Sequence, residues 1–385
     1  DEILEGGLAP EATVMSWRGE SGGIQAAKMK HDVVMTPGTP LYFDHYQAGP
    51  AGEPEAIGGF NTLKMVYDYY PVPKELDSTD ATYVLGAQAN VWTEFISTRE
   101  HLEYMVLPRM LALAEGLWTP KSEKNYDDFY ERLQNQFTEF DEKGFHYCPG
   151  NFTVAVKPVS QDGKLLVTLS SEIPGADIYY TKDGSDPGAE SNKYINPVQI
   201  DSSLTLKAVI VINGKVMGVK PAEQKFVVHK AIGRNVTYTN PPSTYYPADG
   251  PNTLTDGVRG TTAPGKYWHA FEGNDLVATI DLGQETPIEK ISIGCLQSYR
   301  DWIFLPQSLT YEISNDGKSF TDLGTVKNTI SPDEKSALVK DCTLAFPEQK
   351  ARYVRGTAKN LGTCPKGHPG ERKPAWLLAD EIMVQ

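Results

Sequence analysis

The pattern of apolar and polar residues changes its period twice along this chain of 385 residues. From residue 1 to about 150, short apolar runs alternate with stretches whose apolar residues recur at helical spacing. Strands alternating with helices indicate a parallel sheet, either doubly wound or closed as a (β/α)₈ barrel. From about 151 to 230 apolar residues recur at every second position. From 231 to 385 similar strands continue between longer, aromatic-rich loops, so these two regions predict two β-sandwiches.

The first region contains six clearly patterned segments. We expect buried strands at 12–17, 32–36 and 83–92, and helices at 20–31, 98–117 and 126–143. In the second region, strands are expected at 168–173, 177–181 and 205–212, separated by turns rich in Asp, Gly and Pro. No segment repeats at a fixed period, which argues against a solenoid or propeller.

Composition excludes several classes of partner. The chain has 36 Lys and Arg against 50 Asp and Glu, a formal net charge of −14 at pH 7. It has no basic cluster interleaved with aromatics, and phosphate binding needs a basic face, so we expect no nucleic acid partner. There is also no run of about 18 apolar residues, so no membrane span is expected.

The start of the chain, its charge and its cysteines each add one expectation. The chain begins at Asp1 without an initiator Met or a signal peptide, so we interpret it as a piece of a longer protein. An acidic surface keeps an exported protein soluble, and a periplasmic, cell-surface or secreted bacterial protein is expected. None of the four cysteines forms a C-x-x-C pair, which argues against a zinc ribbon. Cys295 and Cys342 lie in strand-like stretches, where they either form a disulfide or stay free.

Chemically suggestive residues lie where three of the expected strands end. They are Trp17, Tyr42 with Asp44, and Trp92 with Glu94. Residues i and i+2 of a strand point to the same side, so each carboxylate shares a side with its aromatic ring. Apolar sugar faces stack on such rings, and carboxylates accept hydrogen bonds from sugar hydroxyls. A lone Trp in a strand is usually core, but three successive strand ends of this kind favour a sugar site at the carboxyl face of a barrel.

Five blocks of sequence in this region resemble the latter half of the catalytic domain of glycoside hydrolase family 20. The resemblance runs from the fifth barrel strand to the last helix and covers residues 1 to about 145. The blocks are DEILEGG (1–7), ATVMSWRG (12–19), YFD (42–44), GAQANVWTE (86–94) and PRMLALAEGLW (108–118). The fold class that follows is α/β plus all-β: the second half of a (β/α)₈ TIM barrel, followed by two β-sandwich domains. The domain boundaries expected are 1–150, 151–230 and 231–385.

The resemblance implies an exo-β-N-acetylhexosaminidase that removes terminal β-linked GlcNAc or GalNAc from glycans or chitooligosaccharides. In that family the substrate's own 2-acetamido oxygen attacks the anomeric carbon, giving an oxazolinium intermediate and retention of configuration, with no cofactor. By match of motif, Trp17 and Trp92 would form walls of the sugar pocket. Tyr42 would donate a hydrogen bond to the acetamido oxygen, and Asp44 and Glu94 would bind the 4- and 6-hydroxyls.

The family's catalytic pair does not occur in these 385 residues. That pair is an adjacent Asp-Glu after His-x-Gly-Gly, whereas Asp1-Glu2 is followed by Ile-Leu-Glu-Gly-Gly and matches the next strand. The resemblance therefore implies that the general acid lies in a missing N-terminal barrel half of the parent chain, and that this chain alone is inactive. The alternative is a non-catalytic carbohydrate-binding or adhesin protein with a degenerate barrel.

The two later regions also carry resemblances. ADIYYTKDGSDP (176–187) resembles the small C-terminal sandwich of chitobiases and hexosaminidases, which we interpret as a spacer. The third region resembles a discoidin-like domain, of the coagulation factor 5/8 type C kind. Its blocks are LTDGVRG (254–260), ATIDLG (278–283), PQSLTYEISNDGKSF (306–320), ARYVRG (351–356) and ADEIMV (379–384).

The discoidin-like resemblance implies two sites. One is a structural Ca²⁺ ion held by oxygens of Asp256, Thr261 and Glu381, the hard ligands that calcium prefers; the alternative is an ordinary Asp turn and a surface Glu. The other is a carbohydrate site on the loops, for which Tyr299 and Trp302 are the candidates. The remaining tryptophans of this region, Trp268 and Trp376, are expected in the core.

Overall fold

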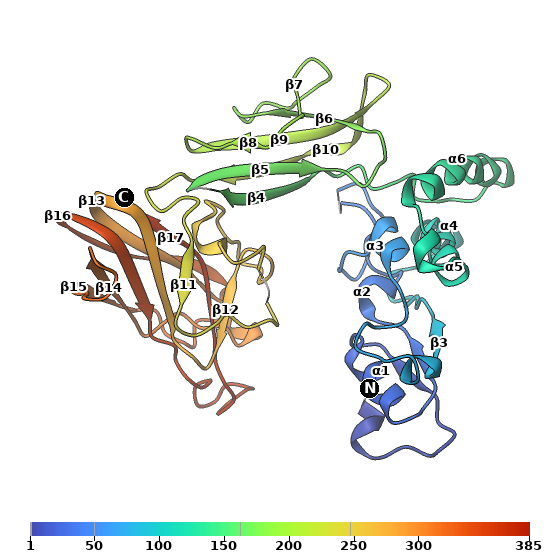
Figure 1. Cartoon of the computed structure of the whole chain (residues 1–385), viewed down its shortest axis with the longest axis horizontal. Coiled ribbons are helices and arrows are strands. Elements are labelled where there is room, and N and C mark those ends of the chain that lie inside the picture. Colours follow the sequence, from blue (N-terminus) through green and yellow to red (C-terminus); the bar gives the residue numbers. More distant parts are fainter. Residues whose placement is uncertain (1, 50, 162, 247) are drawn as a thin grey trace. The chain divides into compact units, whose positions relative to one another are not determined.

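The structure is a computed structural model that describes residues 2–49, 51–161, 163–246 and 248–385. Its chain forms two units, shown in sequence colours in Figure 1. The N-terminal unit comprises the chain up to Val154 together with Ser171–Ile178 and Val209–Pro221. The C-terminal unit comprises Ala155–Ser170, Tyr179–Ala208 and Ala222–Gln385. Each unit is described by itself below.

A three-stranded parallel sheet organises the N-terminal unit. Its order is β1-β2-β3, with β1 at Val14–Ser16, β2 at Val33–Met35 and β3 at Val84–Ala87. Parallel strands with helical connections and a family 20 pattern fit part of a TIM barrel. The expected strands are present but shorter than the sequence pattern suggested.

Strand β1 is buried on one side only. Val14 and Ser16 are buried and share a core with α1 (Ser21–Lys28), whereas Met15 between them is 44% exposed. Helix α1 lies so close to β2 that a Cβ on Gly23 would meet the Met35 sulfur at 2.5 Å. The expectation of a fully buried strand was therefore wrong for Met15, because α1 covers one face of the sheet and leaves the other open.

The helix expected over 98–117 is two helices. They are α4, Arg99–Val106, and α5, Arg109–Trp118, and they part at Leu107-Pro108. Proline has no N–H to donate to the preceding turn, and its ring clashes with the carbonyl four residues back, so a helix ends before it. The helical period alone continues across this break, which is why the pattern predicted one helix.

The expected helix over 126–143 is confirmed as α6, Tyr126–Lys143. Asn125 caps its start by accepting hydrogen bonds from two backbone N–H groups through its side-chain oxygen, and Gly144 ends it at a left-handed φ of +69°. The remaining short elements of this unit are η1 (Glu2–Glu5), α2 (Gly38–Leu41), α3 (Leu63–Asp68), η2 (Asp80–Tyr83) and η3 (Lys121–Glu123).

Seven strands between residues 155 and 226 form two sheets. The orders are β4-β5-β8 and β10-β9-β6-β7. Their bounds are β4 Ala155–Gln161, β5 Lys164–Ser170, β6 Asp177–Thr181, β7 Asn192–Lys193, β8 Val198–Gln199, β9 Leu204–Ile212 and β10 Lys215–Phe226. Two facing sheets with alternating burial agree with the small sandwich that the period-two pattern predicts.

The last 150 residues form a seven-stranded antiparallel system around an extensive apolar core. The two longest strands, β13 (Leu276–Gln297) and β16 (Leu338–Ala358), run side by side in Figure 1 and break register between Asp281 and Thr286. The other elements are β11 Val236–Tyr238, η4 Thr253–Thr255, β12 His269–Glu272, η5 Tyr299–Asp301, β14 Ser308–Ser314, β15 Thr321–Lys327 and β17 Trp376–Val384.

Three further expectations concern the cysteines, two tryptophans and a membrane span. Cys295 and Cys342 are both buried in this core and both free, so the structure contains no disulfide between them. Trp268 is fully buried, as expected, whereas Trp376 is only partly buried. None of the helices in the described ranges combines the length and hydrophobicity needed to cross a membrane.

Candidate active site

A cavity of about 750 Å³ lies at the carboxyl ends of the parallel strands of the N-terminal unit. Its wall contains all five side chains that the sequence predicts to bind or act on substrate: Trp17, Tyr42, Asp44, Trp92 and Glu94. Three stretches of chain, far apart in sequence, thus meet at one surface. The other lining residues are Met15, Thr36, His45, Ile57, Gln88 and Asn90.

The turn after β1 positions Trp17. Ser16, the last residue of that strand, donates a hydrogen bond from Oγ to the Gly19 carbonyl over 2.7 Å and accepts one from the Gly23 N–H over 2.8 Å. These two bonds hold the turn between strand and helix, so Trp17 leaves the sheet in a defined direction. The Arg18 guanidinium lies 4.9 Å from the centre of the Trp17 ring.

Backbone pairing positions Tyr42 beside the chain that leaves β3. The Phe43 N–H donates to the Asn90 carbonyl over 2.8 Å, and the Asn90 N–H donates to the Leu41 carbonyl over 2.9 Å. This pairing extends the parallel sheet by one bridge and brings the Tyr42 ring to 6.2 Å from that of Trp92, at an angle of 56°.

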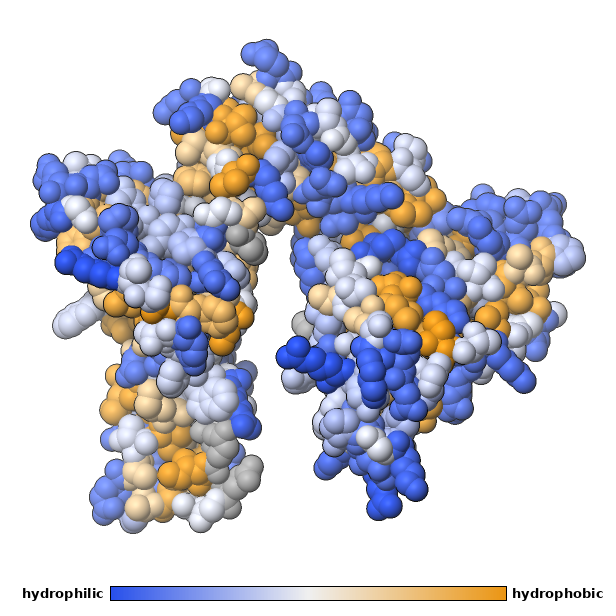
Figure 2. Space-filling model, turned by 180° about the vertical axis from the view of Figure 1, so that it is seen from behind, coloured by the Kyte–Doolittle hydropathy of each residue, from blue (hydrophilic) through white to orange (hydrophobic). Residues whose placement is uncertain are grey.

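The two tryptophans of the cavity are exposed. Trp17 is 40% exposed and Trp92 is 53% exposed. Apolar side chains also show at the surface of the N-terminal part in Figure 2. Exposed aromatic surface at the mouth of a cavity is typical of a binding site, because a ligand that covers the rings regains the hydrophobic free energy.

Asp44 carries an unused hydrogen-bond acceptor. Its side chain is only 5% exposed, and its Oδ1 has no hydrogen-bond partner within the described part of the protein. Buried acceptors are normally satisfied, so the unpaired Oδ1 sets Asp44 apart from the other residues that line the cavity. Glu94, by contrast, is exposed at the wall.

Arg109, in α5, fixes the backbone on both sides of Asp44. It is fully buried and donates hydrogen bonds to the carbonyls of Phe43 and His45, over 2.5 and 3.0 Å, and to the Asn61 carbonyl over 2.9 Å. Burial lowers the pKa of Arg109 to about 9. This residue has a positioning role that sequence reasoning missed, because its partners are backbone carbonyls about 50 to 65 residues earlier in the chain.

His45 and Asn61 form a second layer that the sequence did not single out as functional. The Asn61 side-chain amide donates to the carbonyls of Gly38 and Tyr42, over 2.7 and 2.8 Å, and lies 3.1 Å from Nδ1 of His45. Burial lowers the pKa of His45, which favours its neutral ring in the cavity wall. The one available signal was its place directly after Asp44.

The aromatic pair predicted to bind carbohydrate in the C-terminal unit is largely covered. The Lys335 ammonium lies 3.0 Å from the centre of the Tyr299 ring. A Cβ on Gly370 would come within 3.0 Å of the Trp302 ring, so the chain passes directly over that ring. Both side chains also meet His368 edge-on.

A different tyrosine in the same unit presents an open ring. Tyr245 is 75% exposed, and one face of it stacks on Trp376 at a ring distance of 5.8 Å and an angle of 30°. Tyr246 supports the same tryptophan edge-on at 5.4 Å. Sequence reasoning assigned Trp376 to the core and gave Tyr245 no role, and only the fold reveals that they form one platform.

Two of the three predicted calcium ligands lie together and the third does not join them. Glu381 is fully buried in β17 and Asp256 is 6% exposed, so the alternative of a surface Glu is wrong. Burial and the mutual repulsion of these groups raise the pKa of Asp256. Thr261 is exposed, and its hydroxyl accepts a hydrogen bond from the Ala263 N–H over 3.3 Å. Within the described ranges, no group of three or more His, Cys, Asp or Glu side chains is placed to hold a metal ion.

Three family models match successive parts of the chain. The catalytic domain of glycosyl hydrolase family 20 matches residues 1–121, the chitobiase/beta-hexosaminidase C-terminal domain matches 160–220, and the F5/8 type C domain matches 235–368. These are the three families that the sequence blocks resembled, in the same order.

Known proteins similar to this chain are longer than it is. A beta-hexosaminidase from Porphyromonas gingivalis is 36% identical over 341 residues, which cover 83% of this chain and 41% of that protein. A beta-N-acetylhexosaminidase from Cellulomonas fimi is 29% identical over 149 residues, 38% of this chain and 30% of that protein. A solved GH20 exo-beta-N-acetylglucosaminidase from Vibrio harveyi is 29% identical, covers 37% of this chain and 22% of its own, and has a TM-score of 0.33. This chain thus spans about two fifths of the first relative.

Proposed function

Since this chain carries part of a family 20 glycosyl hydrolase catalytic domain, we propose that it is the C-terminal portion of an exported exo-β-N-acetylhexosaminidase. Its barrel portion is the second half of the (β/α)₈ barrel. The observation that carries the proposal is that Trp17, Tyr42, Asp44, Trp92 and Glu94 all line the same cavity of about 750 Å³. The substrate is a glycan or chitooligosaccharide that ends in a β-linked N-acetylhexosamine.

In the proposed reaction the substrate supplies its own nucleophile. The acetamido oxygen bonds to the anomeric carbon while the glycosidic bond breaks, and a general acid gives its proton to the departing oxygen. The resulting oxazolinium ion is opened by water, which restores the acetamide and retains the configuration. No cofactor takes part.

The residues of this chain orient that nucleophile and hold the sugar. The Tyr42 hydroxyl donates to the acetamido oxygen, which keeps that oxygen aligned with the anomeric carbon. Well-aligned intramolecular groups react at very high effective concentrations, so this alignment accounts for much of the rate. Trp17 and Trp92 cover the sugar's apolar faces, and Asp44 and Glu94 accept hydrogen bonds from its hydroxyls.

The general acid and its neighbouring Asp belong, in this proposal, to the part of the barrel outside residues 1–385. Asp1 lies outside the described residues, and Asp1-Glu2 is not proposed as the catalytic pair because its sequence context matches the next strand. Residues 1–385 alone are then expected to be inactive.

The test compares the full-length protein with residues 1–385 on chromogenic glycosides. We expect the full-length protein to cleave the β-GlcNAc glycoside and to leave the β-glucoside, which lacks the acetamido group, intact. Residues 1–385 should cleave neither. If the full-length protein binds N-acetylhexosamine but cleaves no glycoside, the alternative of a non-catalytic carbohydrate-binding or adhesin protein holds. For substitutions at the cavity, Glu139→Gln on the exposed face of α6 is the matched control, and it should leave cleavage unchanged.

For the C-terminal unit we propose carbohydrate binding at the Tyr245–Trp376 platform. The supporting observation is that Tyr245 has a free ring face, whereas Lys335 covers the Tyr299 ring. A sugar ring stacks only on an aromatic face that is free. Retention of the full-length protein on immobilised glycans, compared for Tyr245→Ala and Trp302→Ala, distinguishes the two candidate positions.

A further inference from the structure

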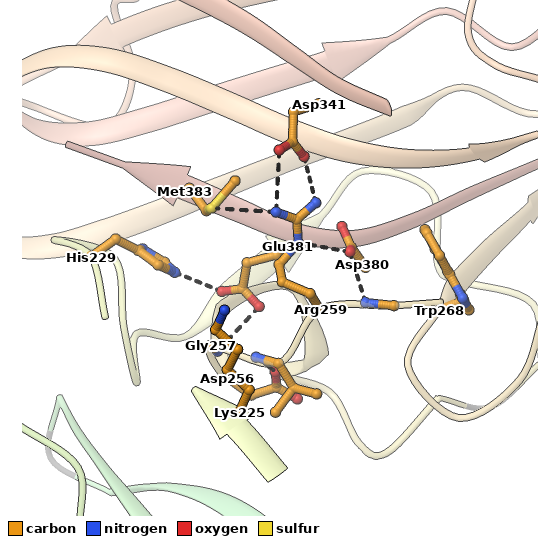
Figure 3. A network of polar contacts seen from close by, with 12 residues as sticks. Lys225, His229, Asp256, Gly257, Arg259, Trp268, Asp341, Asp380, Glu381 and Met383 are labelled. Carbon is orange, nitrogen blue, oxygen red and sulfur yellow. Dashed lines mark hydrogen bonds and ion pairs between the residues drawn. The ribbon is translucent and has the colours of Figure 1, made fainter. Parts of the chain in front are cut away.

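A buried histidine lies against the carboxylates where a metal ion was expected. His229 follows β10 and precedes β11, and its side chain is fully buried, as is that of Glu381. The two side chains meet at 2.7 Å, between Nε2 of the imidazole and Oε1 of the carboxylate. Figure 3 shows this pair beside Asp256 and Gly257.

The ring's other nitrogen shows which way this bond points. The Ala231 N–H donates to Nδ1 of His229 over 3.3 Å, so Nδ1 is an acceptor. In a neutral imidazole the remaining nitrogen then carries the proton. Nε2 of His229 therefore donates to Glu381.

Two of the three other carboxylate oxygens of Asp256 and Glu381 also accept hydrogen bonds from N–H donors. Oε2 of Glu381 accepts from the Gly257 N–H over 3.1 Å, and Oδ1 of Asp256 accepts from the Val258 N–H over 2.8 Å. Calcium needs six to eight oxygen ligands whose lone pairs point at the ion. Here three of the four carboxylate oxygens already each accept a hydrogen bond, and Thr261 is turned away toward Ala263. These residues do not fit a calcium ion.

The backbone holds His229 in this place. The Val227 N–H donates to the Gly257 carbonyl and the Lys230 N–H to the Val384 carbonyl, each over 2.8 Å. Gly257 has a left-handed φ of +73°, and a Cβ there would lie 2.7 Å from Ile232. The connector between the two sandwiches, residues 227–234, is thus packed directly onto the loop that follows η4 and onto β17.

We propose that His229 takes the place of a structural metal ion in this domain, closing the Asp256–Glu381 pair with a hydrogen bond and so joining the connector to the sandwich. Arg259, whose charge acts on Glu381, is committed elsewhere, because its Nε donates to Asp380 over 2.8 Å and its Nη2 pairs with Asp341 (Figure 3). The domain therefore folds without calcium.

The first experiment measures calcium directly in the full-length protein. After dialysis against buffered CaCl₂ and removal of free ion, metal content is determined by mass spectrometry, and hydrogen exchange at Gly257 and Val258 is followed with calcium or with EGTA. We expect far less than one calcium per chain and equal exchange in both buffers. One bound calcium per chain, or slower exchange with calcium than with EGTA, overturns the proposal.

The second experiment tests the hydrogen bond itself. His229→Ala leaves a buried Glu381 oxygen without a donor, and we expect exchange at Gly257 to become faster by about tenfold. His229→Gln keeps an N–H donor and a carbonyl acceptor, and its exchange should stay near that of the unchanged protein. If His229→Gln loses as much protection as His229→Ala, the imidazole bond is not what holds the pair. Should His229→Ala fail to fold, His229→Gln and the calcium measurement still decide the question.

Discussion

The cavity of the N-terminal unit and the buried network of the C-terminal unit both bring carboxylates together, but they treat them in opposite ways. In the cavity, Oδ1 of Asp44 is buried without a partner in the described part of the chain, and Glu94 is exposed. In the network, Glu381 is fully buried and both its oxygens accept hydrogen bonds, from His229 and Gly257. In the first arrangement a buried acceptor is left unpaired among the described residues, whereas in the second each oxygen of Glu381 has a donor.

The aromatic residues of the two regions also differ in their exposure. Trp92 is 53% exposed at the cavity, while Trp268 is fully buried in the sandwich and donates from its indole nitrogen to the Ala263 carbonyl over 3.2 Å. A buried acceptor without a partner costs about 1–3 kcal/mol, and exposed aromatic area forgoes hydrophobic stabilisation. Both unfavourable features occur in residues that line the cavity, and neither occurs at Trp268 or Glu381.

The largest effect, on kcat, is expected at Tyr42, and it gives the strongest test of the difference between the two regions. Tyr42→Phe in the full-length enzyme removes the hydrogen bond to the acetamido oxygen, a donor that acts on developing charge. We expect kcat to fall by about 10²–10³-fold while KM changes little, measured with a chromogenic β-GlcNAc substrate. Equal effects on kcat and KM would make Tyr42 a binding residue only.

Asp44 offers a test that separates ligand binding from stability. Asp44→Asn should lower kcat/KM by about 10–100-fold, because a charged acceptor for a sugar hydroxyl is lost. Its Tm should change little, since Oδ1 has no hydrogen-bond partner to lose among the described residues and only the attraction between the Asp44 charge and the buried Arg109 is removed. Thermal unfolding and steady-state kinetics measure both. A clear fall in Tm would mean that Asp44 is structural, like Glu381.

His229→Ala is expected to affect stability alone. It removes the donor to a buried oxygen of Glu381 and should lower the free energy of unfolding of the C-terminal unit by about 1–3 kcal/mol, without changing kcat. Calorimetry of the full-length protein, with turnover of the β-GlcNAc glycoside as the second readout, provides the measurement. A loss of kcat with unchanged stability would contradict the division between the two regions.

The smallest effect is expected at the platform of the C-terminal unit. Tyr245→Ala should weaken retention on immobilised glycan by up to about tenfold, the equivalent of about 1.4 kcal/mol, and leave thermal unfolding unchanged because the side chain is 75% exposed. Trp302→Ala should leave glycan retention unchanged and lower the temperature of thermal unfolding, since that ring packs against the chain at Gly370. Unaltered retention in Tyr245→Ala would assign glycan binding, if present, to another surface.

Much of the fold follows from local signals that a sequence shows directly. Helix α6 was predicted at its observed bounds because its apolar residues recur at regular helical spacing, and in the structure Asn125 and Gly144 cap it. The helix over 98–117 was predicted as one because its helical period continues across Pro108, which divides it in the structure. Strand β1 was predicted as buried on both sides because alternation cannot reveal which layer is absent from one face.

The candidate site also contains residues that the sequence could predict and residues that only the structure reveals. Three strand ends carrying an aromatic or a carboxylate were enough to nominate Trp17, Tyr42 and Trp92, since parallel strands present their carboxyl ends at one face. Arg109 could not be nominated, because its role depends on carbonyl groups of residues distant in sequence. The same limitation concealed Tyr245, whose partner Trp376 lies about 130 residues away in the chain.

The sequence by itself determined the order of the domains, the strand-end residues that meet at the cavity, and the family resemblance that connects them to chemistry. The tertiary structure decided which polar groups are satisfied. Asp256, Thr261 and Glu381 look like calcium ligands in sequence, but His229, 152 residues before Glu381, supplies the donor that completes the pair. Hydrogen bonds depend on distance and direction in space, and a linear pattern carries neither for residues so far apart.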